Sequence, residues 1–362
     1  MFNMKISIIL GTRPEIIKMS SVIRECEKRN LDYFIIHSNQ HYSENMDKIF
    51  FDDLGIEKPK YNLGIGSGNH GNQTGKILIQ IEEILIKENP DIVLVQGDTN
   101  TTLGGALAAT KLNIKVGHVE AGLRSYNRRM PEETNRIVAD HVSDYLFCPT
   151  EKQKEILLNE GVEENKIFVV GNTVTDAVKQ NIKIAEKNSD IMEKMGLKKD
   201  GYFLVTAHRA LNVDFKENLE KLFDTLKAVK NRFEYTLIYP IHPRTKKMVD
   251  SFSIDTDGIK LIDPVGYFDF LLLEKNARLI FSDSGGVQEE SCILNVPCIT
   301  LRKETERPET VEAGANLIAG IEKDKVLECA EKMINRKRDW KNPYGNGDTG
   351  EQIINVIKND IE

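Results

Sequence analysis

Carboxylates follow two short apolar segments in the N-terminal half of the chain. Asp98 comes after the β-branched segment 91–96. Glu120 directly follows the next such segment, 115–119, and Glu132 lies a few residues further on. A single carboxylate in such a place is more often a helix cap or a solvated charge, and Asp98 stands where a helix N-cap would be. Three of them near strand ends are better explained by acid–base chemistry, which needs carboxylates gathered at one edge of a sheet.

Basic residues and histidines follow other apolar segments. Arg13 and Lys18 come after the first of these, 4–10. An arginine and a lysine beside a helix N-terminus bind a phosphate group well, although an ordinary turn with a surface arginine accounts for Arg13 equally well. His208 and His242 stand at the ends of two segments in the C-terminal half, each close to an arginine. This pairing favours contacts to a phosphate or a leaving group over a structural role.

The strongest local pattern is an apolar segment that breaks into Ser284-Gly285-Gly286 and continues as a helical stretch. Such a turn exposes backbone N–H groups and the positive end of the helix dipole, which together attract an anion. A capped turn between a strand and a helix is the alternative, but paired glycines favour close approach of the backbone to a ligand. Glu289 or Glu290, one turn further on, would then reach the hydroxyls of a ribose.

Short β-branched segments alternate with longer amphipathic ones along the chain, which is typical of βαβ units on a parallel sheet. In the segment 75–88 the apolar residues share one helical face, and Asn89-Pro90 ends that helix before the next strand. The expected strands are 4–10, 33–37, 91–96, 115–119, 145–148, 167–170, 202–206, 235–239, 259–262, 278–282 and 297–301. Further expected helices are 216–230, 269–275 and 286–293.

Length and layout together predict two domains. The 362 residues exceed what one ordinary hydrophobic core supports, and the alternating pattern restarts in the second half. We therefore predict an α/β fold of two Rossmann-like, doubly wound domains that face a central cleft. Residues 1–177 form the N-terminal domain, which carries the carboxylates, and residues 178–345 form the C-terminal one. In such folds ligands bind at the carboxyl ends of the strands.

Composition excludes several classes of function. The net charge is −7 and long basic runs are absent, which argues against a general nucleic-acid binder. No segment approaches the ~20 apolar residues of a membrane span. The N-terminal apolar stretch is too short for a secretory signal, so we expect a cytoplasmic protein without a membrane partner. The seven histidines lack the spacing of metal ligands, and no metal is predicted.

Residues 66–71 fit the pattern GxGxxG letter for letter, but we reject them as a dinucleotide-binding fingerprint. That fingerprint follows a strand and opens the helix of a βαβ unit, whereas residues 58–63 are predicted to form a loop. We interpret the segment as a flexible glycine-rich loop.

Eight short motifs carry most of these residues. In chain order they are GTRPEIIK, QGDTNTT, HVEAGLRS, MPEETNR, TAHR, PIHPR, DSGGVQEE and TERPET. Their order and spacing resemble those of the non-hydrolysing UDP-N-acetylglucosamine 2-epimerases over nearly the whole chain. The resemblance implies a glycosyltransferase-B-like architecture, a homodimer, and a C-terminal helix, 346–362, that crosses back to the first domain.

The resemblance also implies interconversion of UDP-GlcNAc and UDP-ManNAc without NAD or another cofactor. The C2 proton of the sugar is not next to a carbonyl group, so its direct abstraction would be very slow. Breaking the C1–O bond first, with UDP as the leaving group, gives C1 oxocarbenium character that acidifies the C2 proton. Loss of this proton leaves 2-acetamidoglucal, and re-addition of UDP with the proton on the other face inverts C2. Such a route needs a clamp on the diphosphate and carboxylates near C2.

Matching the family's motifs position by position assigns roles to individual residues. The implied catalytic residues are Asp98, Glu120, Glu132 and His208, of which His208 also matches a diphosphate ligand. The implied substrate-binding residues are Arg13, Lys18, His242, Ser284, Gly285, Gly286, Glu290 and Arg307. In bacterial members Gln40 and His41, together with His242, correspond to a second UDP-GlcNAc site that activates the enzyme.

One position departs from the family's pattern and leaves alternatives open. The family usually reads His-Arg-x-Glu-Asn, whereas this chain has Leu211 between Ala210 and Asn212. A carboxylate is therefore missing beside the diphosphate site, which points to an altered substrate contact or loop anchor.

Four alternative functions stay open beside the epimerisation of UDP-GlcNAc. They are the same epimerisation of a modified sugar such as UDP-2,3-diacetamido-glucuronic acid, a hydrolysing epimerase that releases ManNAc and UDP, a glycosyltransferase, and a UDP-sugar sensor. The fold alone does not separate them.

Overall fold

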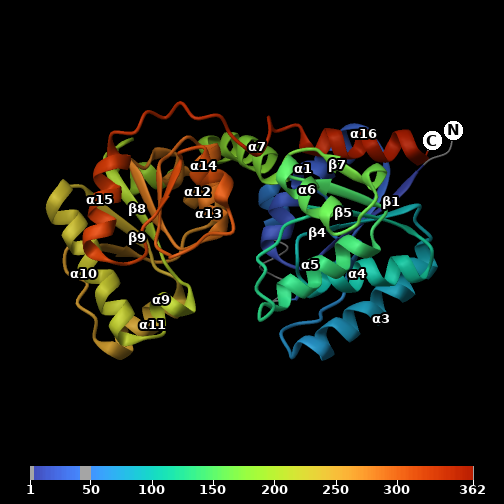
Figure 1. Ribbon diagram of the computed structural model, residues 1–362, viewed down its shortest axis with the longest axis horizontal. Coiled ribbons are helices and arrows are strands. Elements are labelled where there is room, and N and C mark those ends of the chain that lie inside the picture. Colours follow the sequence, from blue (N-terminus) through green and yellow to red (C-terminus); the bar gives the residue numbers. More distant parts are fainter. Residues whose placement is uncertain (1–3, 41–49, 362) are drawn as a thin grey trace. The chain divides into compact units, whose positions relative to one another are not determined.

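The computed structural model describes residues 4–40 and 50–361. The chain divides into two compact units (Figure 1). Unit 1 comprises Met1–Ala177 and Tyr344–Glu362, and unit 2 comprises Val178–Pro343. Each unit has its own parallel sheet covered by helices. The predicted α/β fold with two Rossmann-like, doubly wound domains is confirmed.

Unit 1 is built on a seven-stranded sheet. Its strands are β1 (Lys5–Leu10), β2 (Asp32–His37), β3 (Tyr61–Asn62), β4 (Ile92–Gln96), β5 (Lys115–Val119), β6 (Tyr145–Cys148) and β7 (Ile167–Val169). Its helices include α1 (Arg13–Lys28), α3 (His70–Glu88), α4 (Asn100–Lys111), α5 (Pro131–Val142), α6 (Glu151–Asn159) and α16 (Thr349–Ile361). Helix α7 (Thr173–Asn188) begins in unit 1 and continues past its boundary.

The strands of unit 1 are parallel and lie in the order β3-β2-β1-β4-β5-β6-β7. Strands β1 and β4 are buried along almost their whole length, because helices cover both faces of a sheet of this kind. The order reverses between β1 and β4, so the connections leave that point in opposite directions. The crevice beyond the carboxyl ends of such strands is where doubly wound folds bind their ligands.

Helix α3 illustrates how the sequence pattern becomes structure. Its buried face includes Ile77, Ile81 and Leu85, at the spacing expected for one side of a helix. Asn89 ends the helix in the left-handed conformation, with φ of 43°, and its N–H donates to the carbonyl oxygen of Leu85. Pro90 follows and cannot continue the helix. The predicted end of this helix is confirmed, while its start lies earlier than expected, at His70.

The C-terminal helix α16 packs against α1 within unit 1 (Figure 1). Gly350 allows this approach, because a Cβ atom there would lie 2.8 Å from the carbonyl oxygen of Ser21. The backbone N–H of Gly350 donates to Asp176 over 3.0 Å. Helix α16 therefore belongs to unit 1, together with the N-terminal half of the chain.

Unit 2 repeats the architecture on a six-stranded sheet. Its strands are β8 (Tyr202–Thr206), β9 (Thr236–Pro240), β10 (Lys260–Ile262), β11 (Leu279–Ser282), β12 (Cys298–Thr300) and β13 (Asn316–Ile318). Its helices are α8 (Ile191–Lys194), α9 (Ala210–Val213), α10 (Lys216–Phe233), α11 (Pro243–Phe252), α12 (Tyr267–Asn276), α13 (Gly285–Ile293), α14 (Pro308–Glu312) and α15 (Lys323–Ile334).

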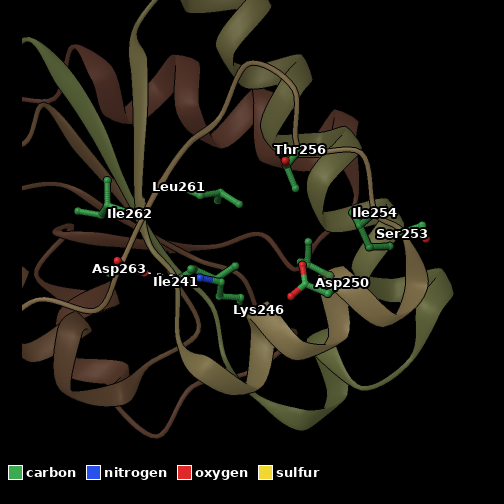
Figure 2. Close-up of a pocket in the computed structure, with 10 residues that line it drawn as sticks. Ile241, Lys246, Asp250, Ser253, Ile254, Thr256, Leu261, Ile262 and Asp263 are labelled. Atoms are coloured by element: carbon green, nitrogen blue, oxygen red, sulfur yellow. Dashed lines mark ion pairs between the residues drawn. The ribbon is translucent and has the colours of Figure 1, made fainter.

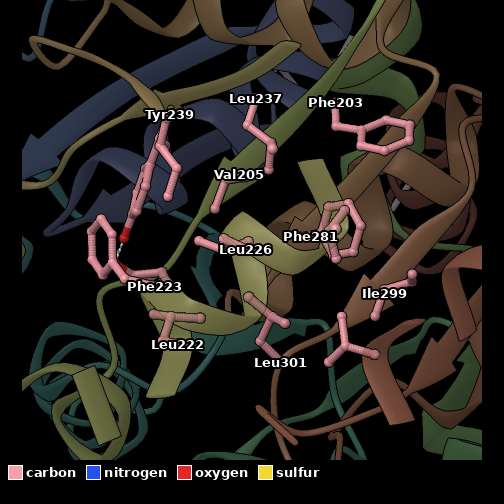
Figure 3. Packing of buried hydrophobic residues seen from close by; sticks show 14 of the residues in the cluster. Phe203, Val205, Leu222, Phe223, Leu226, Leu237, Tyr239, Phe281, Ile299 and Leu301 are labelled. Atoms are coloured by element: carbon pink, nitrogen blue, oxygen red, sulfur yellow. Dashed lines mark hydrogen bonds between the residues drawn. The ribbon is translucent and has the colours of Figure 1, made fainter. Parts of the chain in front are cut away.

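The strands of unit 2 are also parallel, in the order β10-β9-β8-β11-β12-β13, with the reversal between β8 and β11. One face of the sheet carries a large apolar cluster in which aromatic and aliphatic side chains interdigitate (Figure 3). Phe203 stacks on Tyr235 with ring centroids 4.5 Å apart. The buried hydroxyl of Tyr239 donates to the carbonyl oxygen of Ala207 over 2.6 Å, as a buried tyrosine requires a partner. This core fixes the strand ends that carry the site of unit 2.

Two strands, β3 and β13, lie outside the predicted set. Both are short and lie at a sheet edge, where few apolar residues are needed. The prediction that residues 58–63 form a loop is therefore wrong at Tyr61–Asn62. The glycine-rich segment 66–71 follows this edge strand, whereas the dinucleotide fingerprint of doubly wound folds follows the first strand.

Candidate active site

In each unit, two of the predicted site residues lie at the point where the strand order reverses. In unit 1, Arg13 follows β1 and Asp98 follows β4, and these strands are hydrogen-bonded neighbours. In unit 2, His208 follows β8 and Ser284 follows β11, which are also neighbours. Gly11, which precedes Arg13, is required by close packing, since a Cβ atom there would lie 2.1 Å from the hydroxyl oxygen of Thr101.

Asp98 is not a helix cap. The N-cap of α4 is Thr99, whose hydroxyl accepts from the N–H of Thr102 over 3.2 Å. The Asp98 side chain is 36% exposed and forms an ion pair with Arg136 of α5. Arg136 also contacts Glu133 over 2.7 Å. A carboxylate that is held by a cation and still reaches solvent suits proton transfer to a bound ligand.

Glu120 follows β5 and lies buried in a polar cluster. Its carboxylate accepts from the ammonium of Lys18 over 2.6 Å and from the side-chain amide of Gln96. Its backbone φ is 71°, in the left-handed region, which costs a non-glycine residue about 1–3 kcal/mol and is concentrated at functional sites. Lys18, a predicted substrate ligand, is therefore placed against a predicted catalytic carboxylate.

Glu132 lies half-buried in the first turn of α5. Among the described residues no hydrogen bond or ion pair of its side chain is found. The neighbouring Glu133 is buried and accepts from the backbone N–H groups of Ser125 and Tyr126, over 2.9 and 2.7 Å. Burial acts to raise the pKa of Glu133, but these hydrogen bonds and the charge of Arg136 hold it below its usual range. Glu133 thus anchors the loop before α5, and Glu132 is the carboxylate left available.

A buried ionic cluster supports the turns that carry Asp98 and Glu120. Both ring nitrogens of His118 face acceptors, the Asp140 carboxylate at 2.7 Å and the Gly97 carbonyl oxygen at 2.8 Å. Both ring nitrogens thus lie against acceptor oxygens, which fixes the orientation of the ring. Arg124 also contacts Asp140, over 2.6 Å. Burial alone would raise the pKa of Asp140, but the His118 and Arg124 charges hold it below its usual range. Nothing in the sequence pairs Asp140 with His118, and this cluster was not predicted.

In unit 2 the buried carboxylate of Asp283 organises the loop after β8. It accepts from the backbone N–H groups of His208 and Arg209 over 3.0 Å each, and from the Asn212 side chain over 3.0 Å. The His208 ring lies 5.4 Å from that of His242, between centroids. Burial lowers the pKa of His208, although Asp283 opposes the shift. Asp283 was part of a predicted motif, but its organising role was missed.

The N-terminus of α13 is open. Ser284 occupies the N-cap position, yet its side chain makes no capping bond. A Cβ atom at Gly285 would meet no atom within 4 Å, and one at Gly286 would meet only the Ser284 hydroxyl oxygen, at 3.9 Å. The two glycines are therefore not required by packing within the protein. They leave room above backbone N–H groups, which is the arrangement that binds an anion.

Glu289 and Glu290 differ in burial. Glu289 is buried and pairs with Arg307 over 2.6 Å, so this glutamate and the predicted ligand Arg307 hold each other. Glu290 is half-buried. On the neighbouring helix α12, Glu274 is fully buried, and burial together with the charge of Glu290 raises its pKa well above the usual range.

The remaining predicted residues lie in unit 1. Arg13 is exposed at the start of α1. Gln40 is buried, and its side-chain oxygen accepts from the Thr101 hydroxyl over 2.9 Å. His41 lies outside the described residues. The structure thus brings Gln40 close to the turn of Arg13, and the predicted activating site stays a prediction.

Two pockets lie in unit 2. Leu211, the position that departs from the family pattern, is 67% exposed and lines a pocket of about 640 Å³ with Arg209, Arg302 and Lys303. A second pocket, of about 710 Å³, lies between α11 and the residues around β10 (Figure 2). It is lined by Lys246 and Asp263 among others and contains none of the predicted site residues.

Within the ranges 4–40 and 50–361, no cluster of three or more metal-binding side chains is found. No helix in the same ranges is long and apolar enough to cross a membrane.

Comparison with known proteins identifies close relatives. The sequence model of a family described as UDP-N-acetylglucosamine 2-epimerase matches residues 24–358. The UDP-N-acetylglucosamine 2-epimerase of Methanocaldococcus jannaschii is 60% identical over 361 residues, which cover 98% of this chain and 99% of that protein. The UDP-2,3-diacetamido-2,3-dideoxy-D-glucuronate 2-epimerase of Pseudomonas aeruginosa is 41% identical over 359 residues, with coverage of 98% and 99%.

A solved structure is similarly close. The crystal structure of the M. jannaschii UDP-GlcNAc 2-epimerase in complex with UDP-GlcNAc and UDP matches this chain with a TM-score of 0.89 at 60% identity. The match covers 98% of this chain and all of that one. The relative binds a nucleotide sugar, and its fold agrees with this one over nearly the full length.

Proposed function

Because this chain belongs to the UDP-N-acetylglucosamine 2-epimerase family, we propose that it interconverts UDP-GlcNAc and UDP-ManNAc by eliminating and re-adding UDP. One observation carries the proposal most directly. Asp98 and Glu120 stand at the carboxyl ends of β4 and β5, which are hydrogen-bonded neighbours. Inversion at C2 through 2-acetamidoglucal needs a group that removes a proton on one face and a group that returns one on the other.

The two units divide the work in this proposal. Unit 2 binds UDP, with the α13 N-terminus and His208 at the diphosphate and Glu290 at the ribose. A helix N-terminus stabilises the negative charge that develops on the departing UDP. Unit 1 supplies Asp98, Glu120 and Glu132 for proton transfer at C2. Arg13 of unit 1 provides a further cation for the diphosphate.

The charges around the two central carboxylates support different roles for them. Glu120 is buried and paired with Lys18. Asp98 is paired with Arg136 and remains partly exposed. We assign Asp98 to proton transfer with the substrate. Glu120, which holds Lys18, is the second carboxylate for proton transfer at C2.

The proposal is tested by incubating the protein with UDP-GlcNAc in deuterated water and recording proton NMR spectra. Reversible epimerisation predicts deuterium at C2 in both UDP-GlcNAc and UDP-ManNAc. Free ManNAc would instead indicate a hydrolysing enzyme. Absence of C2 exchange would contradict the proposal for this substrate.

The same assay separates the proposed substrate from the modified sugar acted on by the Pseudomonas relative. That sugar carries a carboxylate at C6, which would require an additional cation. UDP-2,3-diacetamido-glucuronic acid is therefore supplied at equal concentration in a competition experiment. The higher identity to the M. jannaschii epimerase leads us to expect faster C2 exchange in UDP-GlcNAc.

We further propose that the active form is a homodimer. Light scattering coupled to gel filtration measures its mass directly, and a monomeric mass at assay concentration would contradict this part.

Replacement of Gly285 tests the UDP-binding part of the proposal. Gly285→Ala should leave the thermal unfolding midpoint unchanged, because the new methyl group meets no protein atom within 4 Å. If the diphosphate rests on this helix N-terminus, the methyl group occupies its place. We expect the Kd for UDP, measured by calorimetry, to rise at least about tenfold, or ~1.4 kcal/mol.

Gly75 of α3 provides the matched control. It is also a helical glycine whose Cβ would meet no atom within 4 Å, but it lies in unit 1 and has no role in the proposed UDP site. Gly75→Ala should leave the UDP affinity unchanged. Equal UDP affinities for the Gly285→Ala and wild-type proteins would remove the α13 N-terminus from the site.

A further inference from the structure

Glu15, in the motif GTRPEIIK, has no role in the mechanism so far. It lies in the first turn of α1, at the carboxyl edge of β1, and its side chain is buried. Its carboxylate accepts from the backbone N–H of Gly11 over 3.1 Å and from the hydroxyl of Thr12 over 2.7 Å. It also accepts from the hydroxyl of Thr99 over 2.9 Å. Three short hydrogen bonds from neutral donors therefore hold this buried carboxylate in the turn, as a buried polar group requires.

The two oxygens of this carboxylate join two different turns. One oxygen binds Gly11 and Thr12 in the turn after β1, and the other binds Thr99 in the turn after β4. Arg13 follows Thr12 directly, and Asp98 precedes Thr99 directly. One side chain therefore fixes the backbone beside the proposed diphosphate cation and beside the proposed acid–base group.

The capping pattern of both helices is organised around Glu15. Thr12 is the N-cap of α1, but its side chain makes no capping bond, because its hydroxyl donates to Glu15 instead. Thr99 caps α4 by accepting from the Thr102 N–H, over 3.2 Å, and donates its own proton to Glu15. Both threonine hydroxyls are thus oriented by the same carboxylate.

The surroundings of Glu15 supply few compensating charges. Asp98 faces it from the turn after β4. On α1 itself Arg13 precedes it, and Lys18 follows with its ammonium on Glu120. The described neighbours on the other elements, at 38–40 and 99–102, are uncharged.

Burial raises the pKa of Glu15 to about 7. The hydrogen bonds from Thr12, Thr99 and Gly11 lower this pKa in part, and the charge of Asp98 raises it further. Glu15 is protonated below this pH and ionised above it.

We propose that Glu15 is a positioning residue for proton transfer at C2, which clamps the Arg13 and Asp98 turns together through its two carboxylate oxygens. This inference rests on the proposed epimerase function. Removing the clamp lets the Asp98 turn move relative to the turn of Arg13, and displacement of a reacting group by about 1 Å costs on the order of 10²-fold in rate. UDP binding should depend little on Glu15, because unit 2 supplies most of the proposed UDP contacts.

The test compares Glu15→Ala with Glu15→Gln in the C2 exchange assay. Glu15→Ala should lower kcat on the order of 10²-fold, with the Kd for UDP within about twofold of wild type. The glutamine retains an acceptor for Gly11 and Thr12 and offers an N–H to the Thr99 oxygen. Glu15→Gln should therefore restore kcat to within about tenfold of wild type. The pH profile of kcat should show an inflection near 7 in the wild type that is absent in Glu15→Gln.

The control is Glu25→Ala, since Glu25 is another buried glutamate of α1 but pairs with Arg29 at the far end of the helix. Glu25→Ala should leave kcat unchanged.

A kcat equal to that of the wild type in a folded Glu15→Ala variant would overturn the inference, as would equal loss of kcat in the alanine and glutamine variants. If Glu15→Ala does not fold, loss of the pH inflection in Glu15→Gln supports the inference and its persistence overturns it. Wild-type protein is assayed in parallel. Loss of C2 exchange in the wild type would contradict the proposed epimerase function, whereas loss in the Glu15 variants alone concerns the role of Glu15.

Discussion

Asp98→Asn should abolish nearly all C2 exchange while UDP binding survives. General acid–base catalysis by one side chain contributes about 10²–10⁴-fold to a rate, and the asparagine amide is too weak an acid and too weak a base to replace the carboxylate. The fold should tolerate the change, because Arg136 keeps its contact with Glu133 when the ion pair to Asp98 is lost. Proton NMR in deuterated water measures the exchange rate, and calorimetry measures UDP binding.

Asp53→Asn is the control for this experiment. Asp53 is an exposed carboxylate of unit 1, and its replacement changes the net charge of the unit by the same amount. We expect normal exchange in that variant. If Asp98→Asn retains exchange within a few-fold of wild type, Asp98 is not the group that transfers the C2 proton, and Glu120 or Glu132 takes its place.

The fold could be predicted from the sequence because its signals are local. Strands such as β4 are continuous apolar runs, and helices such as α3 repeat apolar residues at helical spacing and end at Asn89-Pro90. The edge strands β3 and β13 could not be predicted in this way. They have two and three residues, and what makes them strands is the neighbour they pair with, which the sequence does not display.

The positions of the candidate site residues followed from the same local signals. Asp98 and Glu120 stand at strand ends, and the chain order of a doubly wound sheet brings such ends together. Their partners could not be predicted, because contact depends on folding rather than on spacing. Lys18 is 102 residues from Glu120 and Arg136 is 38 residues from Asp98. The sequence alone therefore assigned Lys18 to the substrate, while the structure places it on a carboxylate.

The supporting carboxylates were the hardest to recognise. Asp283, Glu15 and Asp140 are buried, and each holds backbone or side-chain donors of the turns that carry the site. Two of them lie inside recognised motifs, where a functional reading concentrates on exposed groups. A buried acidic residue needs nearby donors or cations, so an acidic residue that is buried points to a structural anchor. This requirement does not tell which turn the residue anchors.

Removal of Asp140 should have the largest effect on stability. Asp140→Ala leaves the buried His118 ring and the buried Arg124 charge without their carboxylate. Breaking a buried ion pair from one side costs about 3–5 kcal/mol, so we expect a loss of this size in the free energy of unfolding of unit 1. Urea denaturation followed by circular dichroism measures it. The Arg124 contact to Glu160 remains and limits the loss at that end of the cluster.

The pH dependence of the Asp140 effect follows from the sign of its pKa shift. Its pKa is lower in the folded protein, so the ionised form stabilises the fold above the unfolded-state pKa, and this contribution disappears as the pH falls through the folded-state value. The difference between wild type and Asp140→Ala should accordingly be constant near neutral pH and shrink in acid. Glu164→Ala, which removes an exposed pair with Lys154, should change stability far less at every pH. A small Asp140→Ala effect at neutral pH would mean that His118 and Arg124 find water or other acceptors, and that the Gly97–Asp98 turn does not depend on this cluster.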